Sequence, residues 1–264
     1  MCFDDDSRPP IPPIAGGALD STDLVLTAAD GNRFRAFRTR PAEPTGAGVI
    51  VLPDVRGLHH YYEELALRFA EAGIEAVAID YFGRTAGFER RPDGWQHTPH
   101  VAQTTFAGQS ADIAAAAAEL RSAPGDAVTR LFTVGFCFGG RLSVLCATLG
   151  LDLAGVIGFY GVPRGPSHND MPEPIALSDR MHSPVLGLYG GDDPAIPADS
   201  ISAFEAALAE AGVDHRIVIY AGAPHSFFDR KAEAFASESQ AAWQEVLSFI
   251  APDRDAGRDI GRNG

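Results

Sequence analysis

Six short runs of apolar residues mark out most of the chain. Gly, Pro or charged residues bound each run, and the runs lie at 47–53, 75–81, 130–135, 153–160, 184–190 and 215–222. Their apolarity is continuous rather than alternating, which is typical of strands that are buried on both faces of a parallel sheet. The pattern therefore predicts six strands of a parallel sheet covered by helices.

The segments between these runs carry helical signals, and a different pattern precedes them. Helical spacing, alanine-rich stretches and terminal glycines predict helices at 61–73, 108–125, 197–212 and 237–250. Near the start, DLVLTA and RFRAFRTR flank the turn residues ADGN and predict a β-hairpin. Strands that alternate with helices imply right-handed βαβ units. We expect an α/β fold with a mostly parallel central sheet, helices on both faces and an N-terminal β-hairpin.

Composition suggests where the folded domain begins and ends. A chain of 264 residues is a length that an α/β fold can fill as one domain. Residues 1–21 are rich in Asp, Pro and Gly, which predicts an extended leader, and residues 252–264 are polar, which predicts a flexible tail. The single domain is expected at 22–251.

Charge and cysteine content argue against several classes of function. The chain has 21 Lys and Arg against 35 Asp and Glu, and its net charge of −14 repels nucleic acid and anionic lipid. Three cysteines without a CxxC pair argue against a disulfide framework and indicate a reducing compartment. There is no apolar export signal and no apolar run of about 18 residues. We expect a cytoplasmic protein without nucleic-acid or membrane partners.

Motifs for cofactors and metals are also missing from the sequence. The glycines of GAGVIVLPDVRG match neither G-x-G-x-x-G nor G-x-x-x-x-G-K-[ST], which argues against a nucleotide cofactor. His97 and His100 lack a carboxylate or cysteine at helpful spacing, so they are expected to lie in a loop rather than to bind a metal. We expect neither a cofactor nor a metal.

The motif GFCFGG at 135–140 presents a candidate nucleophile. Cys137 follows an apolar strand and precedes the helical run at 141–149. An abrupt strand-to-helix turn strains the residue at its apex, and Gly135 and Gly139 remove side chains that would collide there. The helix N-terminus would stabilise a thiolate at Cys137. The alternative is a core residue, because free cysteine is among the most buried residue types.

A base and an orienting carboxylate follow the last two predicted strands. Asp192 and Asp193 lie in YGGDDPAIP, and His225 lies in GAPHSFFDR. A nucleophile needs a base, and the base needs a carboxylate to orient it. The order Cys137, Asp, His225 corresponds to the order Ser, Asp, His of α/β-hydrolases. Taken separately, each motif could equally be a turn or a surface loop.

Together, GFCFGG, GGDDPAIP and AGAPHSFFDR resemble the dienelactone hydrolase family, cysteine-dependent α/β-hydrolases, over about residues 22–250. The family pattern G-x-C-x-G-G is matched at 135–140. The family turn G-G-x-D-x-x-x-P places its carboxylate on Asp193 rather than Asp192, and the family histidine falls on His225. The resemblance implies a carboxylic ester hydrolase that cleaves lactone or ester bonds of a small molecule with a Cys-His-Asp triad.

The resemblance implies further site residues. The backbone N–H groups of Val55 and Phe138 would form the oxyanion hole. In the family a glutamate contacts the thiol of the resting enzyme, and Asp54, one methylene shorter, takes that place here. Two family arginines bind a substrate carboxylate, and the corresponding Arg84 and Arg230 are each shifted by one position. An anionic substrate is therefore one expectation, with two plain surface arginines as the alternative.

Two other functions stay open at this point. One is an esterase or thioesterase that acts on an uncharged substrate, for which Arg84 and Arg230 would have no substrate role. The other is a non-catalytic relative that binds a ligand and keeps only the fold. The natural substrate and the oligomeric state do not follow from the sequence.

Overall fold

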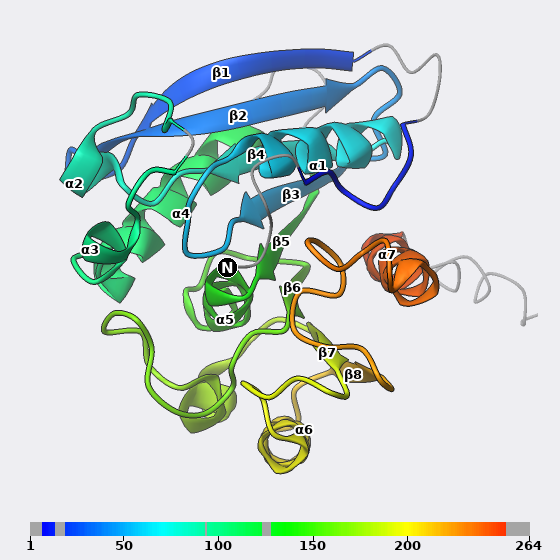
Figure 1. The fold of residues 1–264 in the computed structure, drawn as a ribbon. Coiled ribbons are helices and arrows are strands. Elements are labelled where there is room, and N and C mark those ends of the chain that lie inside the picture. Colours follow the sequence, from blue (N-terminus) through cyan, green and yellow to red (C-terminus); the bar gives the residue numbers. More distant parts are fainter. Residues whose placement is uncertain (1–6, 14–18, 93, 123–127, 252–264) are drawn as a thin grey trace, which may run out of the picture.

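The strands predicted from the apolar runs lie side by side in one twisted sheet (Figure 1). The computed structural model describes residues 7–13, 19–92, 94–122 and 128–251. Within these residues the sheet has eight strands, in the order β1 (Leu19–Thr27), β2 (Arg33–Pro41), β4 (Glu75–Ile79), β3 (Ala47–Leu52), β5 (Arg130–Phe136), β6 (Gly155–Phe159), β7 (Val185–Gly190) and β8 (His215–Tyr220). Strands β1 and β2 form an antiparallel hairpin, and β2 pairs antiparallel with β4. Within the rest of the sheet, from β4 through β3 to β8, neighbouring strands are parallel.

Helices cover both faces of this sheet. The longer ones are α1 (His60–Glu71), α4 (Phe106–Arg121), α5 (Phe138–Leu145), α6 (Ala198–Glu210) and α7 (Ala236–Ile250). Short turns complete the set: α2 (Gly83–Ala86), α3 (Thr98–Val101), η1 (Cys146–Thr148) and η2 (Pro174–Arg180). The predicted fold class, a mostly parallel sheet with helices on both faces and an N-terminal hairpin, is confirmed.

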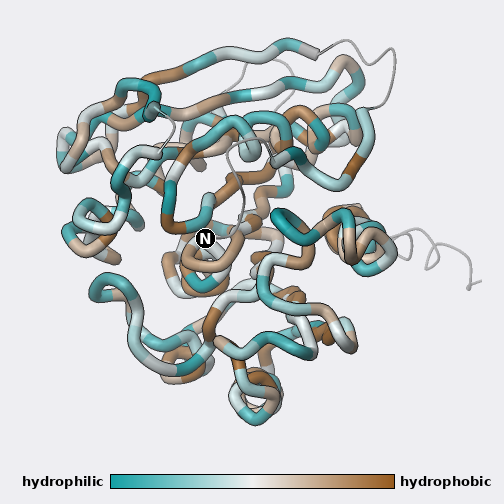
Figure 2. The backbone as a smooth tube through the Cα atoms, viewed as in Figure 1, coloured by the Kyte–Doolittle hydropathy of each residue, from teal (hydrophilic) through white to brown (hydrophobic). Residues whose placement is uncertain are grey.

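The alternating directions of strand side chains explain why the central runs are apolar throughout. On β3, Val49 and Val51 belong to the apolar layer that includes α1 and α7, whereas Ile50 and Leu52 belong to the layer that includes α4 and α5. Each fully buried aliphatic side chain contributes about 1.5–3 kcal/mol relative to exposure. The central strands are accordingly more hydrophobic than the peripheral segments (Figure 2).

The strand order reverses at β3, which has β4 on one side and β5 on the other. In open α/β sheets, ligands bind outside the carboxyl ends of the strands at such a reversal. The pairing of Leu52 with Gly135 and of Phe136 with Phe159 brings the carboxyl ends of three strands level with one another. The loops that follow β3, β5 and β6 therefore meet at one edge of the sheet.

Strand β1 begins at Leu19, three residues before the predicted start of the domain at residue 22. Within the predicted leader, Pro9 is buried and Ile11 packs against the apolar layer that includes α1. Residues 1–6 and 14–18 of the leader, and the predicted tail at 252–264, lie outside the described residues. In the part of the chain that the structure describes, no helix is long and apolar enough to cross a lipid bilayer.

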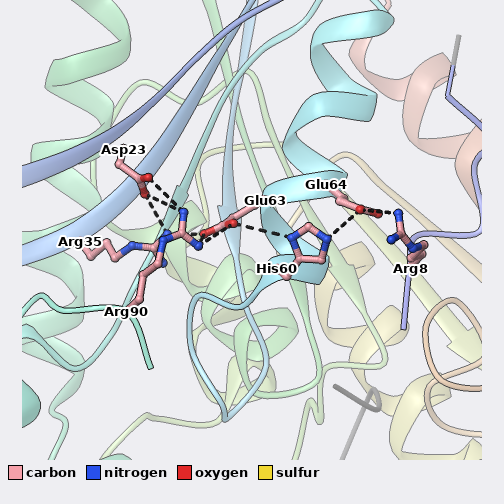
Figure 3. A network of polar contacts seen from close by, with 7 residues as sticks. All are labelled: Arg8, Asp23, Arg35, His60, Glu63, Glu64 and Arg90. Atoms are coloured by element: carbon pink, nitrogen blue, oxygen red, sulfur yellow. Dashed lines mark hydrogen bonds and ion pairs between the residues drawn. The ribbon is translucent and has the colours of Figure 1, made fainter. Parts of the chain in front are cut away.

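Ion pairs tie the hairpin to α1 (Figure 3). Glu63 of α1 is buried and pairs with Arg35 of β2, and it also pairs with Arg90 at 2.9 Å. Both arginines pair with Asp23 of β1 as well. The same network continues through His60 and Glu64 of α1 to Arg8. The Arg35–Glu63 pair of this network is buried, and removal of one partner from such a pair leaves an uncompensated charge.

Candidate active site

Cys137 lies at the apex of the turn between β5 and α5. Its φ of 55° and ψ of −111° are strained for a residue with a side chain. A Cβ on Gly135 would lie 1.8 Å from the carbonyl oxygen of Gly139, and one on Gly139 would lie 2.2 Å from the carbonyl oxygen of Leu52. Only glycine fits at these two positions, as the motif predicts. The Cys137 side chain is half-buried at the N-terminus of α5.

Cys146 has a different environment. It lies at the end of the same helix, is 1% exposed, and its thiol donates a hydrogen bond to the carbonyl oxygen of Leu142 at 3.2 Å. Burial raises the pKa of the Cys146 thiol well above its ordinary value. Cys146 is a core residue without thiolate character at neutral pH.

The loops after β7 and β8 bring Asp193 and His225 together. His225 Nδ1 lies 2.6 Å from Asp193 Oδ2, and the Asp193 carboxylate is shielded from solvent. Asp193 Oδ1 accepts the N–H of Ala195 at 2.9 Å, so both oxygens are held. Asp192, in contrast, is exposed. Of the two adjacent aspartates, Asp193 is thus the one that contacts the imidazole, through Nδ1.

Phe159 and Tyr160, at the end of β6, connect the two halves of the site. The N–H of Cys137 donates to the carbonyl oxygen of Phe159 at 3.0 Å. The next residue, Tyr160, packs its ring against the imidazole of His225, with 4.8 Å between the ring centroids. Cys137 and His225 therefore flank the same two residues at the carboxyl edge of the sheet.

The loop after β3 has one backbone donor without an acceptor. The N–H groups of Asp54, Arg56, Gly57 and Leu58 all donate hydrogen bonds within the protein. Among the described residues, the N–H of Val55 has no such acceptor. The loop is thus rigid but leaves one donor available.

A second donor comes from the first turn of α5. The N–H of Phe138 precedes the first intrahelical bond, which runs from the N–H of Arg141 to the carbonyl oxygen of Cys137 at 3.1 Å. Within the described chain no acceptor takes the Phe138 N–H. Gly139 packs directly on the carbonyl oxygens of Leu52 and Pro53, so the turn of α5 and the Val55 loop are in contact. An oxyanion hole requires two such donors beside a nucleophile.

Asp54 is fully buried beside these donors. Its Oδ1 accepts the N–H of Arg56 at 2.9 Å. Its Oδ2 is buried and has no hydrogen-bond partner in the described parts of the chain. A buried carboxylate oxygen without a partner is costly, so this atom is available to a group that enters the site.

The two candidate arginines differ in their surroundings. The guanidinium of Arg84 pairs with the buried Asp112 of α4 and with Asp30 at 2.6 Å, so it links α2 to α4 and to the hairpin turn. A substrate carboxylate could bind Arg84 only if both of these ion pairs broke. The two ion pairs were not predicted from the sequence. Arg230 is exposed, and among the described residues its side chain has no ion pair.

Asp229, beside the imidazole, was not among the site residues predicted from the sequence, and His97 was predicted only to lie in a loop. Asp229 is 4% exposed, and its Oδ2 lies 2.6 Å from the hydroxyl of Tyr160. Only its position in HSFFD, four residues after His225, could have drawn attention to it. His97 is half-buried, and burial lowers its pKa although the charge of Asp54 partly opposes this.

The fold and the geometry of this edge define the class of the protein as an α/β-hydrolase, with a strand-to-helix nucleophile turn and a carboxylate–histidine pair. Comparison of the sequence narrows this class. The model of the dienelactone hydrolase family matches residues 34–253. The chain belongs to the dienelactone hydrolase family and is a carboxylic ester hydrolase, as the resemblance of the three motifs predicts.

Individual relatives agree with this assignment. A protein of Escherichia coli K12 named "Putative carboxymethylenebutenolidase" is 28% identical and covers 92% of this chain and 93% of its own length. A Synechocystis protein of the same name is 31% identical, over 79% of this chain and 89% of its own. The crystal structure of a Klebsiella pneumoniae protein titled "Putative Dienelactone Hydrolase" has a TM-score of 0.76 at 28% identity, over 88% of this chain and 98% of the other.

Proposed function

We propose that this enzyme hydrolyses lactone or ester bonds of small molecules through a thioester on Cys137, with Asp193 and His225 as the other members of a triad. One observation carries the proposal. Cys137 lies at a strained turn on a helix N-terminus, at the same sheet edge as the hydrogen-bonded Asp193–His225 pair.

The proposed reaction has two halves. In the first, the Cys137 thiolate attacks the carbonyl carbon, the C–S bond forms, and the N–H groups of Val55 and Phe138 bind the oxyanion. The C–O bond then breaks, and the departing alkoxide takes a proton from the His225 imidazolium. In the second half, neutral His225 accepts a proton from water, the hydroxide attacks the thioester, and the acid and the thiolate are released.

Sulfur chemistry restricts the substrates. A thiolate leaves a tetrahedral intermediate more readily than an amine, so attack on an amide reverses, whereas attack on a lactone or an activated ester goes forward. We propose that Arg230, rather than the paired Arg84, is the arginine available to a substrate carboxylate. We further propose that Asp54 Oδ2 accepts a hydrogen bond from the thiol or from a substrate hydroxyl.

Substitution of the two described cysteines tests this function. Cys137→Ala is expected to abolish hydrolysis of p-nitrophenyl acetate, because the covalent step needs the sulfur. Cys146→Ala is the matched control and should leave kcat/KM nearly unchanged, because Cys146 only packs in the core. Full turnover by Cys137→Ala would overturn the proposed mechanism.

A further inference from the structure

The site contains a second buried carboxyl group that the proposed reaction does not use. Asp229 belongs to the turn that follows His225 and is 4% exposed. One of its oxygens, Oδ2, lies 2.6 Å from the hydroxyl of Tyr160, and the other accepts the backbone N–H of Arg230. A carboxyl group in such a dry position costs more free energy than an apolar side chain of similar size. Its presence beside a catalytic imidazole calls for an explanation.

Tyr160 links this carboxyl to His225. It is fully buried, and its φ of 38° lies in the left-handed region, which is strained for a bulky residue. The ring of Tyr160 packs on the imidazole of His225, and its hydroxyl group forms a hydrogen bond with Asp229. Strained backbone that persists at a site is held there by the surrounding contacts, and the Asp229 hydrogen bond is one of them.

Contacts other than the Asp229 carboxyl group also anchor the turn that carries this residue. The N–H groups of Asp229 and Lys231 both donate to the carbonyl oxygen of Ser226 at 3.2 Å. Two side chains from other elements also bind the turn: Tyr61 of α1 donates to the carbonyl oxygen of Phe228 at 2.9 Å, and Ser239 of α7 donates to that of Phe227 at 2.8 Å. These anchors fix the backbone, so the Asp229 carboxyl is available for a different role.

The groups that face Asp229 determine its charge. Burial raises the pKa of Asp229 to about 8. The charge of Asp54 adds to this rise in pKa. The hydrogen bonds from Tyr160 and from the N–H of Arg230 oppose the rise, and so does the interaction with His225. At neutral pH the carboxyl is therefore mostly protonated and uncharged, and it becomes a carboxylate only in mildly alkaline solution.

We propose that Asp229 is a positioning residue: its neutral carboxyl group, acting through Tyr160, holds the His225 imidazole in place without adding a second negative charge beside it. The inference rests on the proposed function of His225 as the base. When Asp229 ionises, it adds a second negative charge, besides that of Asp193, close to the imidazole. The extra negative charge repels the negative charge that develops on the oxyanion when water attacks the thioester.

The sign of the resulting pH dependence follows directly. Below about pH 8, Asp229 is mostly neutral and adds no charge to the site. Above that pH the added carboxylate destabilises the oxyanion of the deacylation step, so this step slows. We expect kcat to fall about tenfold on the alkaline side, which corresponds to roughly 1.4 kcal/mol, while KM stays nearly constant.

The test compares pH profiles of kcat for wild type, Asp229→Asn and Tyr160→Phe between pH 6 and 10. Asn is close in shape to a neutral carboxyl group and cannot ionise, so Asp229→Asn is expected to keep neutral-pH activity within about threefold and to lose the alkaline decline. Tyr160→Phe removes a hydrogen bond that favours the ionised form, so the decline should move to higher pH. Asp192→Asn, the same chemical change at an exposed position, should retain the wild-type profile.

A second measurement does not depend on any variant or on turnover. Nitrogen-15 NMR of the His225 ring in the wild type should show a change in chemical shift near pH 8, as Asp229 ionises beside it. The inference is overturned if the wild type shows no such change and no alkaline decline, or if the decline persists in Asp229→Asn. Failure of the proposed function has a different signature, which is loss of any dependence of hydrolysis on Cys137.

Discussion

At the scale of single residues, burial decides which of two adjacent aspartates serves the imidazole. Asp193 and Asp192 differ in neither charge nor reach, but the Asp193 carboxylate is shielded from solvent and binds His225 Nδ1, whereas Asp192 is exposed. A shielded carboxylate interacts more strongly with an imidazolium, because water screens it less. The same reasoning separates Cys137 from the buried Cys146.

Substitution at these two positions should therefore have unequal effects. Asp193→Asn keeps the shape but presents the wrong hydrogen-bonding partner to Nδ1, and we expect kcat to fall by about 10³–10⁴-fold. Asp192→Asn should change kcat less than about twofold. Steady-state hydrolysis of an activated ester, with circular dichroism as the check on folding, measures both. A larger loss in Asp192→Asn would show that the wrong carboxylate has been assigned.

At the scale of elements, contacts between loops build the site, and ion pairs hold the elements that carry those loops. The first turn of α5 rests on the end of β3 through Gly139, so the turn that carries the Phe138 donor lies next to the loop that carries the Val55 donor. Further away, the network around Glu63 fixes α1, which begins directly after the Val55 loop, against the hairpin (Figure 3).

Removal of Glu63 tests the role of this network. Glu63→Ala leaves the buried Arg35 with only Asp23 as a partner, and we expect a loss of up to about 3 kcal/mol in the free energy of unfolding. Glu245→Ala is the matched control, because it breaks the more exposed pair with Arg216 and should cost less than about 1 kcal/mol. Urea denaturation gives both values. Equal losses would contradict a special role for the Glu63 network.

At the scale of the whole molecule, much of the fold follows from the sequence. The apolar runs give the parallel strands and the glycine pattern gives the nucleophile turn, because both depend on residues close together in the chain. The pairing of Arg84 with Asp112 and the bond between Tyr160 and Asp229 could not be predicted, since 28 and 69 residues separate the partners. The packing of Ile11 on the core likewise depends on long-range contacts.

Net charge also acts at this scale. A chain of net charge −14 repels an anionic substrate, so such a substrate needs a local cation. If Arg230 supplies it, Arg230→Gln should raise KM about tenfold for a lactone that carries a carboxylate and leave KM for the neutral analogue unchanged. The neighbouring exposed Lys231→Gln controls for charge alone. Equal effects of the two variants, or equal effects on the two substrates, would remove Arg230 from substrate recognition.

The central claim is that the Cys137 sulfur becomes acylated during turnover. Rapid acid quenching of the wild-type enzyme with p-nitrophenyl acetate, followed by peptide mass spectrometry, tests it most directly. The account predicts an acetyl group on the peptide that contains Cys137, present during turnover and gone once the substrate is exhausted. Hydrolysis at the full rate with the acetyl group on another residue, or on none, would contradict it.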